Sequence, residues 1–244
     1  MKMVWRGLAV LLVALLALQL YFVARIAAMA VMAPESTTFE RSEAWRISTE
    51  KGRLPWRQQW VNYSQISDNL KRAVIASEDD GFSQHDGVDW EAVEKAWEKN
   101  AKAEQRAAAR KPANPQAAVK QPKVIGGSTI TQQLAKNLFL AGERTLLRKG
   151  QELVLTLALE QLLSKQRILE IYLNHVEWGE GVFGAEAAAQ HYFRKPASKL
   201  SAYEAARLAV MLPRPKYFEK LPNSGYLSNR AGVIVGRMGD AQLP

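Results

Sequence analysis

The hydrophobic pattern of the chain begins with a long uncharged stretch near the N-terminus. Residues 7–24, GLAVLLVALLALQLYFVA, contain no charged side chain over eighteen positions, close to the shortest length for a membrane-spanning helix. Lys2 and Arg6 precede this stretch, and by the positive-inside rule they predict a cytoplasmic N-terminus. We therefore expect residues 1–33 to form a cytoplasmic N-terminus and one retained transmembrane anchor, with the rest of the chain across the membrane.

A cleaved signal peptide is the alternative interpretation of this segment. The small residues at 28–30, AMA, are similar to a cleavage site. The apolar run is long for a signal peptide, however, and Arg25 lies between it and the candidate site. Both interpretations export the chain, so we do not expect nucleic acid as a partner.

Beyond the anchor, the pattern predicts a mainly α-helical protein. Residues 34–67 form a juxtamembrane segment with weak pattern, whose tryptophans either lie at the level of lipid head groups or pack in a core. Residues 68–244 form one domain, with helices predicted at 68–80, 89–110, 128–140, 146–163, 165–174 and 201–211. No convincing run of alternating apolar and polar residues predicts a strand. Within this domain, residues 101–123 contain a stretch rich in Pro, Ala, Gln and Lys, and we expect a flexible insertion there.

Composition narrows the chemistry that this domain can support. A hydrophobic content of 48% over 244 residues is sufficient for one good-sized core. The absence of cysteine excludes disulfides, zinc–thiolate sites and thiol catalysis. The net charge of +9 favours anionic partners such as lipid head groups, phosphates or acidic polymers.

An acidic stretch at residues 77–87, SEDDGFSQHDG, is the first candidate for chemistry. Its carboxylates lack the alternating register of a calcium loop, and the three histidines of the chain lack zinc-ligand spacing, so we predict no metal site. Glu78 ends an apolar helix, where desolvation raises the pKa of a carboxyl group into the range of a general acid or base. We expect Phe82 to pack beneath it, and Asp79 and His85 to orient the loop.

A polar helix face is predicted after the glycine pair at 126–127. Ser128 or Thr129 can cap this helix, whose leucines and isoleucine recur every four residues on the inner face. Two adjacent polar rows lie on the other face, Gln132 with Lys136 and Gln133 with Asn137. Such a face suits sugar hydroxyls and phosphate, although an ordinary solvated face remains the alternative.

The next helix carries an acid among apolar residues. Arg148 and Lys149 lie four and three residues before Glu152, which on a surface makes an ion pair worth only about 0.3–0.5 kcal/mol. Residues 153–159 are almost entirely apolar, so we expect Glu152 to be partly buried and paired. A buried, paired carboxylate is either structural or catalytic.

Five segments in this order resemble the motifs of a known enzyme family. They are EDDGFSQHDG at 78–87, GGSTITQQLAKNLFL at 126–140, RKGQE at 148–152, KQRILEIYLN at 165–174 and, more loosely, NRAGVIVGRM at 229–238. They resemble the motifs of bacterial peptidoglycan glycosyltransferases, glycosyltransferase family 51. The single anchor and the absence of a transpeptidase motif set are typical of the monofunctional, biosynthetic members.

The resemblance implies a lysozyme-like helical fold with a smaller, membrane-facing lobe. It also implies polymerisation of glycan strands from lipid II by inverting glycosyl transfer, with release of undecaprenyl pyrophosphate. Glu78 matches the catalytic base and Glu152 the second catalytic acid. The resemblance assigns substrate binding to Asp79, Phe82, His85, Gly87, Ser128, Thr129, Gln132, Gln133, Lys136, Asn137, Arg144, Arg148, Lys149, Lys165 and Asn174.

The same resemblance implies surroundings and partners. The enzyme is expected in the bacterial inner membrane as a single-pass protein with its catalytic domain in the periplasm. Its partners are then lipid II, the nascent glycan strand, the membrane, and other cell-wall synthesis and division proteins. No cofactor is required, although a divalent cation, Mg or Mn, can bind at the pyrophosphate. The insertion at 101–123 is longer than is usual in the family, and we expect it to be disordered without substrate.

Two other functions compete with glycan synthesis. A lysozyme-like hydrolase would share the fold and need an acidic Glu, but it has no use for the cations Lys136, Arg148 and Lys149. A scaffold with an inert domain has no use for Glu78 and Glu152. The residues therefore favour a glycosyltransferase.

Overall fold

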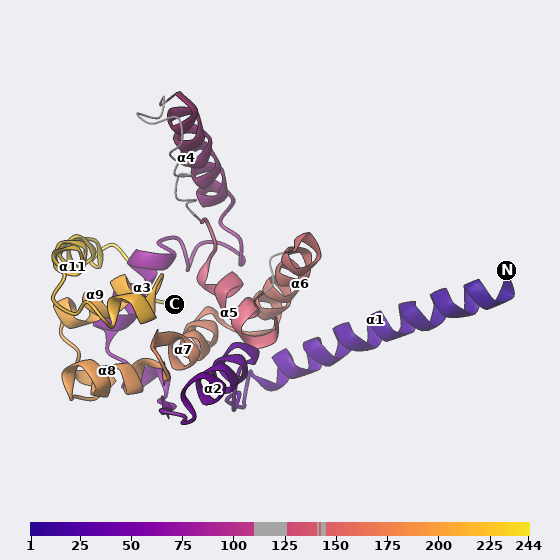
Figure 1. The fold of residues 1–244 in the computed structure, drawn as a ribbon, viewed down its shortest axis with the longest axis horizontal. Coiled ribbons are helices and arrows are strands. Elements are labelled where there is room, and N and C mark those ends of the chain that lie inside the picture. Colours follow the sequence, from indigo (N-terminus) through magenta and orange to yellow (C-terminus); the bar gives the residue numbers. More distant parts are fainter. Residues whose placement is uncertain (110–125, 141, 143–144) are drawn as a thin grey trace.

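The computed structural model describes residues 1–244 except 110–125, 141 and 143–144. Helix α1 (Lys2–Ala28) projects from the rest of the molecule (Figure 1). Most of its side chains are exposed. Within the described part of the chain, it is the one helix long and apolar enough to cross a membrane. Its last turn differs, because Ile26 and Met29 are buried in the core of the globular part.

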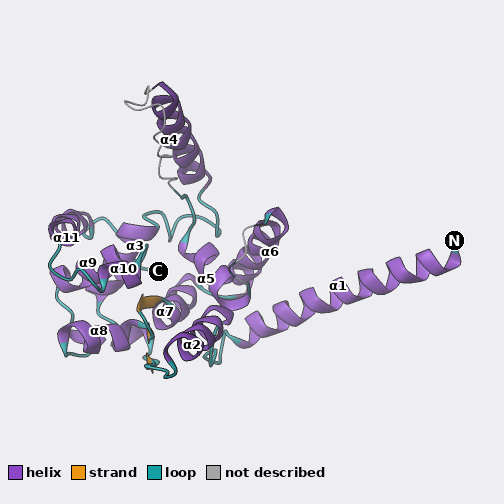
Figure 2. Ribbon diagram, in the orientation of Figure 1, coloured by secondary structure: helices purple, strands orange, loops and turns teal. Residues whose placement is uncertain are grey.

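The globular part is mainly helical, as the sequence predicts. Figure 2 shows the helices α2 (Thr38–Lys51), α3 (Asp68–Glu78), α4 (Trp90–Ala109), α5 (Ile130–Phe139), α6 (Leu146–Leu162), α7 (Lys165–His175), α8 (Ala185–Phe193), α9 (Ala202–Met211), α10 (Pro215–Phe218) and α11 (Gly225–Arg237). Short 3-10 turns lie at Tyr63–Gln65 and Ala197–Lys199. A serine or threonine hydroxyl accepts a backbone N–H bond at the start of seven of these helices, which satisfies donors that a helix leaves unpaired.

Two groups of helices form most of the globular part. In one, α3 packs against α9 and α11; in the other, α5 packs against α6, α7 and α2. α7 contacts α5, α6 and α8, and its residues from Ile168 to His175 are all buried. Helix α4 stands out from the rest (Figure 1).

A small sheet is present that the sequence pattern did not reveal. β3 (Val182–Phe183) lies between β1 (Arg57–Gln58), to which it is parallel, and β2 (Glu177–Gly179), to which it is antiparallel. Strands of two or three residues are too short to display an alternating pattern, and both faces of β2 and β3 are buried.

Helix α2 was also absent from the prediction, for a different physical reason. Its buried residues are Glu40, Glu43 and Ile47, so the inward face carries two carboxylates. A helix that buries charge has no apolar period to detect. The sequence analysis likewise did not anticipate α8, α10 and α11.

The predicted flexible insertion at 101–123 begins within a helix. Residues 101–109 continue α4, as the predicted helix at 89–110 required. Residues 110–123 lie outside the described residues. The domain boundaries proposed from sequence remain predictions.

Candidate active site

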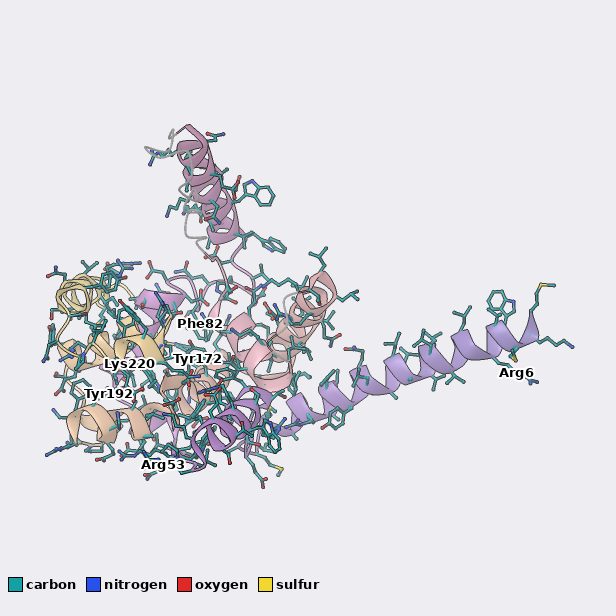
Figure 3. All side chains as sticks on the ribbon, viewed as in Figure 1. Arg6, Arg53, Phe82, Tyr172, Tyr192 and Lys220 are labelled. Carbon is teal, nitrogen blue, oxygen red and sulfur yellow. The ribbon has the colours of Figure 1, made fainter. Side chains whose placement is uncertain are left out.

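Glu78 occupies the last position of α3 and is largely buried. Burial raises the pKa of its carboxyl group, the neighbouring charge of Asp79 adds to the rise, and a hydrogen bond from Gln133 partly offsets it. In that bond, Gln133 Nε2 donates to Glu78 Oε2 at 3.0 Å, while the hydroxyl of the fully buried Tyr172 donates to Gln133 Oε1 at 3.0 Å. Tyr172 lies inside the globular part (Figure 3). Its hydroxyl therefore fixes the amide that faces the carboxylate.

Hydrogen bonds from buried groups hold the loop after Glu78 in place. Asp79 is buried and accepts hydrogen bonds from His85 Nε2 at 2.8 Å and from the backbone N–H of Ile130 at 2.9 Å. His85 Nδ1 in turn accepts from the backbone N–H of Gly87 at 3.1 Å, so the proton resides on Nε2. Phe82 is completely buried. These hydrogen bonds hold the loop in place, and the packing of Phe82 beneath Glu78 stays a prediction.

The start of α5 is tied to the same loop. Thr129 Oγ1 donates to the carbonyl oxygen of Gly87 at 2.6 Å and also caps α5, with Gln132 completing a capping box. The side chains of Thr129 and Gln132 therefore stabilise the start of α5 at the edge of the site. Asp79, through Ile130, adds a negative charge at this positive helix end.

Glu78 and Ser128 share a cavity of about 380 Å³, here called the Glu78 cavity. Besides these two, its polar lining consists of Ser77, Asp79, Asp80, Asp89, Glu91, Lys95, Lys99, Thr129 and Arg237. The first turns of α4 form one wall, because Gly127 lies tightly against the backbone of Ala92 and Val93. This cavity offers an activated carboxylate to a neutral or cationic group.

Ser128 also lines a second cavity of about 460 Å³, here called the basic cavity. Helices α5 and α6 supply the lining residues Gln132, Gln133, Lys136, Asn137, Arg148, Lys149 and Glu152. Other elements supply Phe39, Val176, Glu177, Leu212 and Pro215. Because Ser128 and the Glu78–Gln133 hydrogen bond connect the two cavities, a bound anion would lie next to Glu78.

Glu152 organises the cations of the basic cavity. The residue is 3% exposed, accepts a hydrogen bond from Arg148 Nη1 at 2.8 Å and pairs closely with Lys149. Arg148 Nε is buried and has no hydrogen-bond partner among the described residues, which leaves one guanidinium donor for a ligand. The predicted burial and pairing of Glu152 are confirmed.

Known proteins share this sequence over nearly its full length. Residues 47–239 match the model of the family described as Transglycosylase. The chain belongs to the transglycosylase family. It is 57% identical over 94% of its length to the biosynthetic peptidoglycan transglycosylase of Burkholderia thailandensis, of which it covers 83%. It is 51% identical over 99% of its length to the relative of the same description in Paraburkholderia phytofirmans, of which it covers 93%. The resemblance drawn from the five motifs is thereby confirmed.

Several residues that the motifs assign to substrate binding in this transglycosylase do not line either cavity. These are Phe82, His85, Gly87, Lys165 and Asn174. The ammonium group of Lys165 lies 4.6 Å from the ring centroid of Phe82 and pairs with Glu160 at 2.8 Å. Asn174 exchanges hydrogen bonds with the backbone of Val61. Both side chains therefore support the site from behind. Arg144 lies outside the described residues.

The structure also adds cavity residues that the sequence analysis did not name. Lys95 and Lys99 project from α4, and Arg237, near the end of α11, pairs with Asp80 at 3.0 Å. Glu177 comes from β2. The one sequence signal for Glu177 was an acid within the apolar run VEWG, three residues after Asn174.

Within the described ranges of this transglycosylase, no group of three or more His, Asp or Glu side chains is arranged to hold a metal ion. Glu152 in the basic cavity is instead paired with Arg148 and Lys149. The donor set of the site is therefore suited to anions.

Proposed function

We propose that this transglycosylase polymerises glycan strands from lipid II by inverting glycosyl transfer and releases undecaprenyl pyrophosphate. Family membership makes the chain a peptidoglycan glycosyltransferase, and the proposal adds the substrate and the mechanism. One observation carries it: a buried carboxyl group with a raised pKa, Glu78, lies beside a cavity whose wall carries Lys136, Arg148 and Lys149. When a hydroxyl attacks a glycosyl pyrophosphate, a base must accept the hydroxyl proton and a cationic site must stabilise the departing pyrophosphate. Glu78 and the basic cavity supply these two groups side by side.

In this mechanism Glu78 acts as the general base. Its carboxylate takes the proton of the acceptor sugar's 4-hydroxyl as the oxygen attacks the anomeric carbon of the donor. The new C–O bond forms on the face opposite the leaving group, and the bond to the pyrophosphate breaks, so that an α-linked donor gives a β-linked glycan. The pyrophosphate departs with the electron pair, and the proton passes from Glu78 to solvent.

The basic cavity stabilises the leaving group. Negative charge develops on the pyrophosphate as the bond breaks, and preorganised cations in a partly enclosed site lower the energy of that state. Arg148 and Lys149 are held in place by Glu152, and Arg148 Nε is left to donate to a phosphate oxygen. Glu152 thus contributes to catalysis by positioning these cations.

The charge of the basic cavity bears on whether the reaction requires a cofactor. Three cationic side chains can balance a pyrophosphate, so we propose that no cofactor is required and that Mg or Mn, when bound, is held by the pyrophosphate itself. The N-terminal apolar helix is consistent with a single membrane anchor. We propose that the anchor lies in the inner membrane with the catalytic domain in the periplasm, where other cell-wall synthesis and division proteins can bind.

The test compares wild type with Glu78→Gln in detergent, using labelled lipid II and separation of products by size. Wild type is expected to yield muramidase-sensitive polymer, and Glu78→Gln to lose turnover by a factor of about 10²–10⁴ with the fold intact. Glu50→Gln, which changes an exposed carboxylate on α2, is the matched control and should keep wild-type turnover. Full turnover in Glu78→Gln contradicts the base assignment. Cleavage of preformed glycan without polymerisation would indicate a lytic enzyme instead, and neither activity in a folded sample would indicate a scaffold.

A further inference from the structure

Glu177 is a buried carboxylate that lines the basic cavity, as Glu152 does. It is the first residue of β2, is 7% exposed, and lines the cavity together with the apolar side chains of Phe39, Val176 and Leu212. Its Oε1 atom is buried and accepts no hydrogen bond of good geometry from the described residues. Most buried polar atoms are satisfied, so an unsatisfied carboxylate oxygen in a binding cavity calls for a ligand.

The charges around Glu177 do not neutralise it. Lys216 of α10 lies 3.3 Å from Glu177 Oε1, but it pairs more closely with Glu43 of α2. Arg46, also on α2, binds Glu43 at 2.8 Å and Glu180 at 3.3 Å. One lysine is thus shared between two buried carboxylates, and the nearest arginine is occupied by others.

The remaining groups near Glu177 do not supply a cation either. Burial and the charges of Glu219 and Glu177 raise the pKa of Tyr192 of α8, so its hydroxyl stays neutral. The same cavity is lined by cations of α5 and α6, of which Arg148 and Lys149 are paired with Glu152. Burial raises the pKa of Glu177 to about 7, with the charge of Glu43 adding to the rise and Lys216 opposing it. Near neutral pH, an appreciable share of this carboxyl group carries a proton.

We propose that Glu177 is a further substrate-binding residue of the basic cavity, and that its carboxyl group donates a hydrogen bond to an uncharged oxygen of the glycan donor. A sugar hydroxyl or an amide carbonyl supplies such an oxygen. The inference rests on the proposed function, because it assumes that the donor occupies this cavity.

The lining residues of the basic cavity then have complementary tasks. Lys136 and Arg148 bind the pyrophosphate, and Glu177 binds the neutral sugar part of the donor. An incoming pyrophosphate brings negative charge toward Glu177, which favours the protonated carboxyl further. Donor binding is therefore coupled to the uptake of one proton from solvent onto Glu177, and affinity falls as the pH rises through its pKa.

The experiment measures lipid II binding by titration calorimetry with the full chain in detergent. The Glu78→Gln background prevents turnover and, within the described ranges, removes the other carboxyl group with a raised pKa. In this background, the dissociation constant is expected to rise about tenfold from pH 6 to pH 8, and about half a proton should be taken up at pH 7, measured in buffers of different ionisation enthalpy. Adding Glu177→Gln supplies an amide that donates at every pH, so both effects should vanish while affinity at pH 6 is kept within about threefold.

Glu180→Gln is the matched control, because Glu180 belongs to the same ion network and does not line the cavity. Adding Glu180→Gln to the Glu78→Gln background should leave the pH dependence of lipid II binding unchanged. A second variant, Lys216→Met, removes the cation that lowers the pKa of Glu177 and should move the midpoint of the pH dependence upward. Because Lys216→Met keeps Glu177 itself, it tests the role of Glu177 even if the Glu177→Gln variant does not fold.

Three results would overturn the inference: the same pH dependence in the Glu177→Gln variant, an unmoved midpoint in Lys216→Met, or no binding of lipid II by any variant. Polymerisation by wild type, measured separately, shows whether the proposed function itself stands. Polymer formation together with an unchanged Glu177→Gln profile means that only the role of Glu177 is wrong.

Discussion

At the scale of single residues, the environment of Glu78 determines what it can do. A base must be ionised to accept a proton, and burial works against ionisation. The pKa of Glu78 therefore lies above its ordinary value, and turnover should fall as the pH drops through that raised pKa. Gln133 limits the rise, because its amide N–H stabilises the ionised form.

Replacing Gln133 with Ala should move the acid limb of the pH–rate profile upward by about one pH unit, because a hydrogen bond to a charged group is lost. Turnover at pH 6 should then fall more than turnover at pH 8. Tyr172→Phe removes only the hydroxyl that orients the amide, so it should shift the limb in the same direction by less. The measurement is kcat against pH with labelled lipid II; an acid limb that stays in place or moves down would contradict this account.

At the scale of elements, the site depends on one loop that is locked to its neighbours. Gly87 ends this loop with a φ of +89°, a conformation that favours glycine. A Cβ atom there would lie 2.7 Å from Thr156 Cγ2 and 2.8 Å from Glu160 Cγ, both on α6. The carbonyl of Gly87 also accepts the hydroxyl of Thr129 at the start of α5. One glycine thus allows the loop, the start of α5 and α6 to lie close together.

Gly87→Ala should lower the free energy of unfolding by about 3 kcal/mol, the sum of backbone strain and overpacking. Gly150→Ala is the control, because nothing lies within 4 Å of its added Cβ in helix α6. In a helix interior, that change should stabilise the protein by up to about 1 kcal/mol. Thermal or denaturant unfolding in the same detergent compares the two, and equal stability of both variants would show that the Gly87 backbone adapts freely.

At the scale of the whole molecule, the anchor helix is part of the catalytic domain's packing. The side-chain amides of Gln19 and Gln151 exchange two hydrogen bonds, at 3.0 and 3.1 Å, and Phe22 packs edge-on against Phe139. Arg167 donates to the backbone carbonyl oxygen of Met29, just after α1. Because α6 carries Arg148, Lys149 and Glu152, the end of α1 supports this part of the basic cavity.

Two truncations distinguish a stabilising role of α1 in the catalytic domain from a role as membrane anchor alone. Deletion of residues 2–18 removes the exposed part of α1 and should leave the unfolding temperature of the domain unchanged. Deletion of residues 2–33 also removes the buried side chains of Ile26 and Met29, each worth about 1.5–3 kcal/mol, and should lower it by several degrees. Unfolding is followed in one detergent for both forms. Identical unfolding temperatures would mean that α1 only anchors the domain.

The sequence by itself determined the features that depend on local pattern. Short stretches of sequence were sufficient to predict the apolar N-terminal helix, the helical class and the burial of Glu78 and Glu152. The family followed from motifs that are each short and local. The helix of residues 38–51 escaped detection because it buries Glu40 and Glu43, and the strands because they are too short to show a period.

Only the tertiary structure decided which of the predicted residues line a cavity. Lys165 and Asn174 belong to a motif, yet their side chains brace the core, whereas Glu177 reaches the basic cavity without belonging to any motif used here. The partners of Glu177 come from α2 and α10, far away along the chain. Its burial and shared cation arise from packing between distant segments, and no local spacing of residues encodes such contacts.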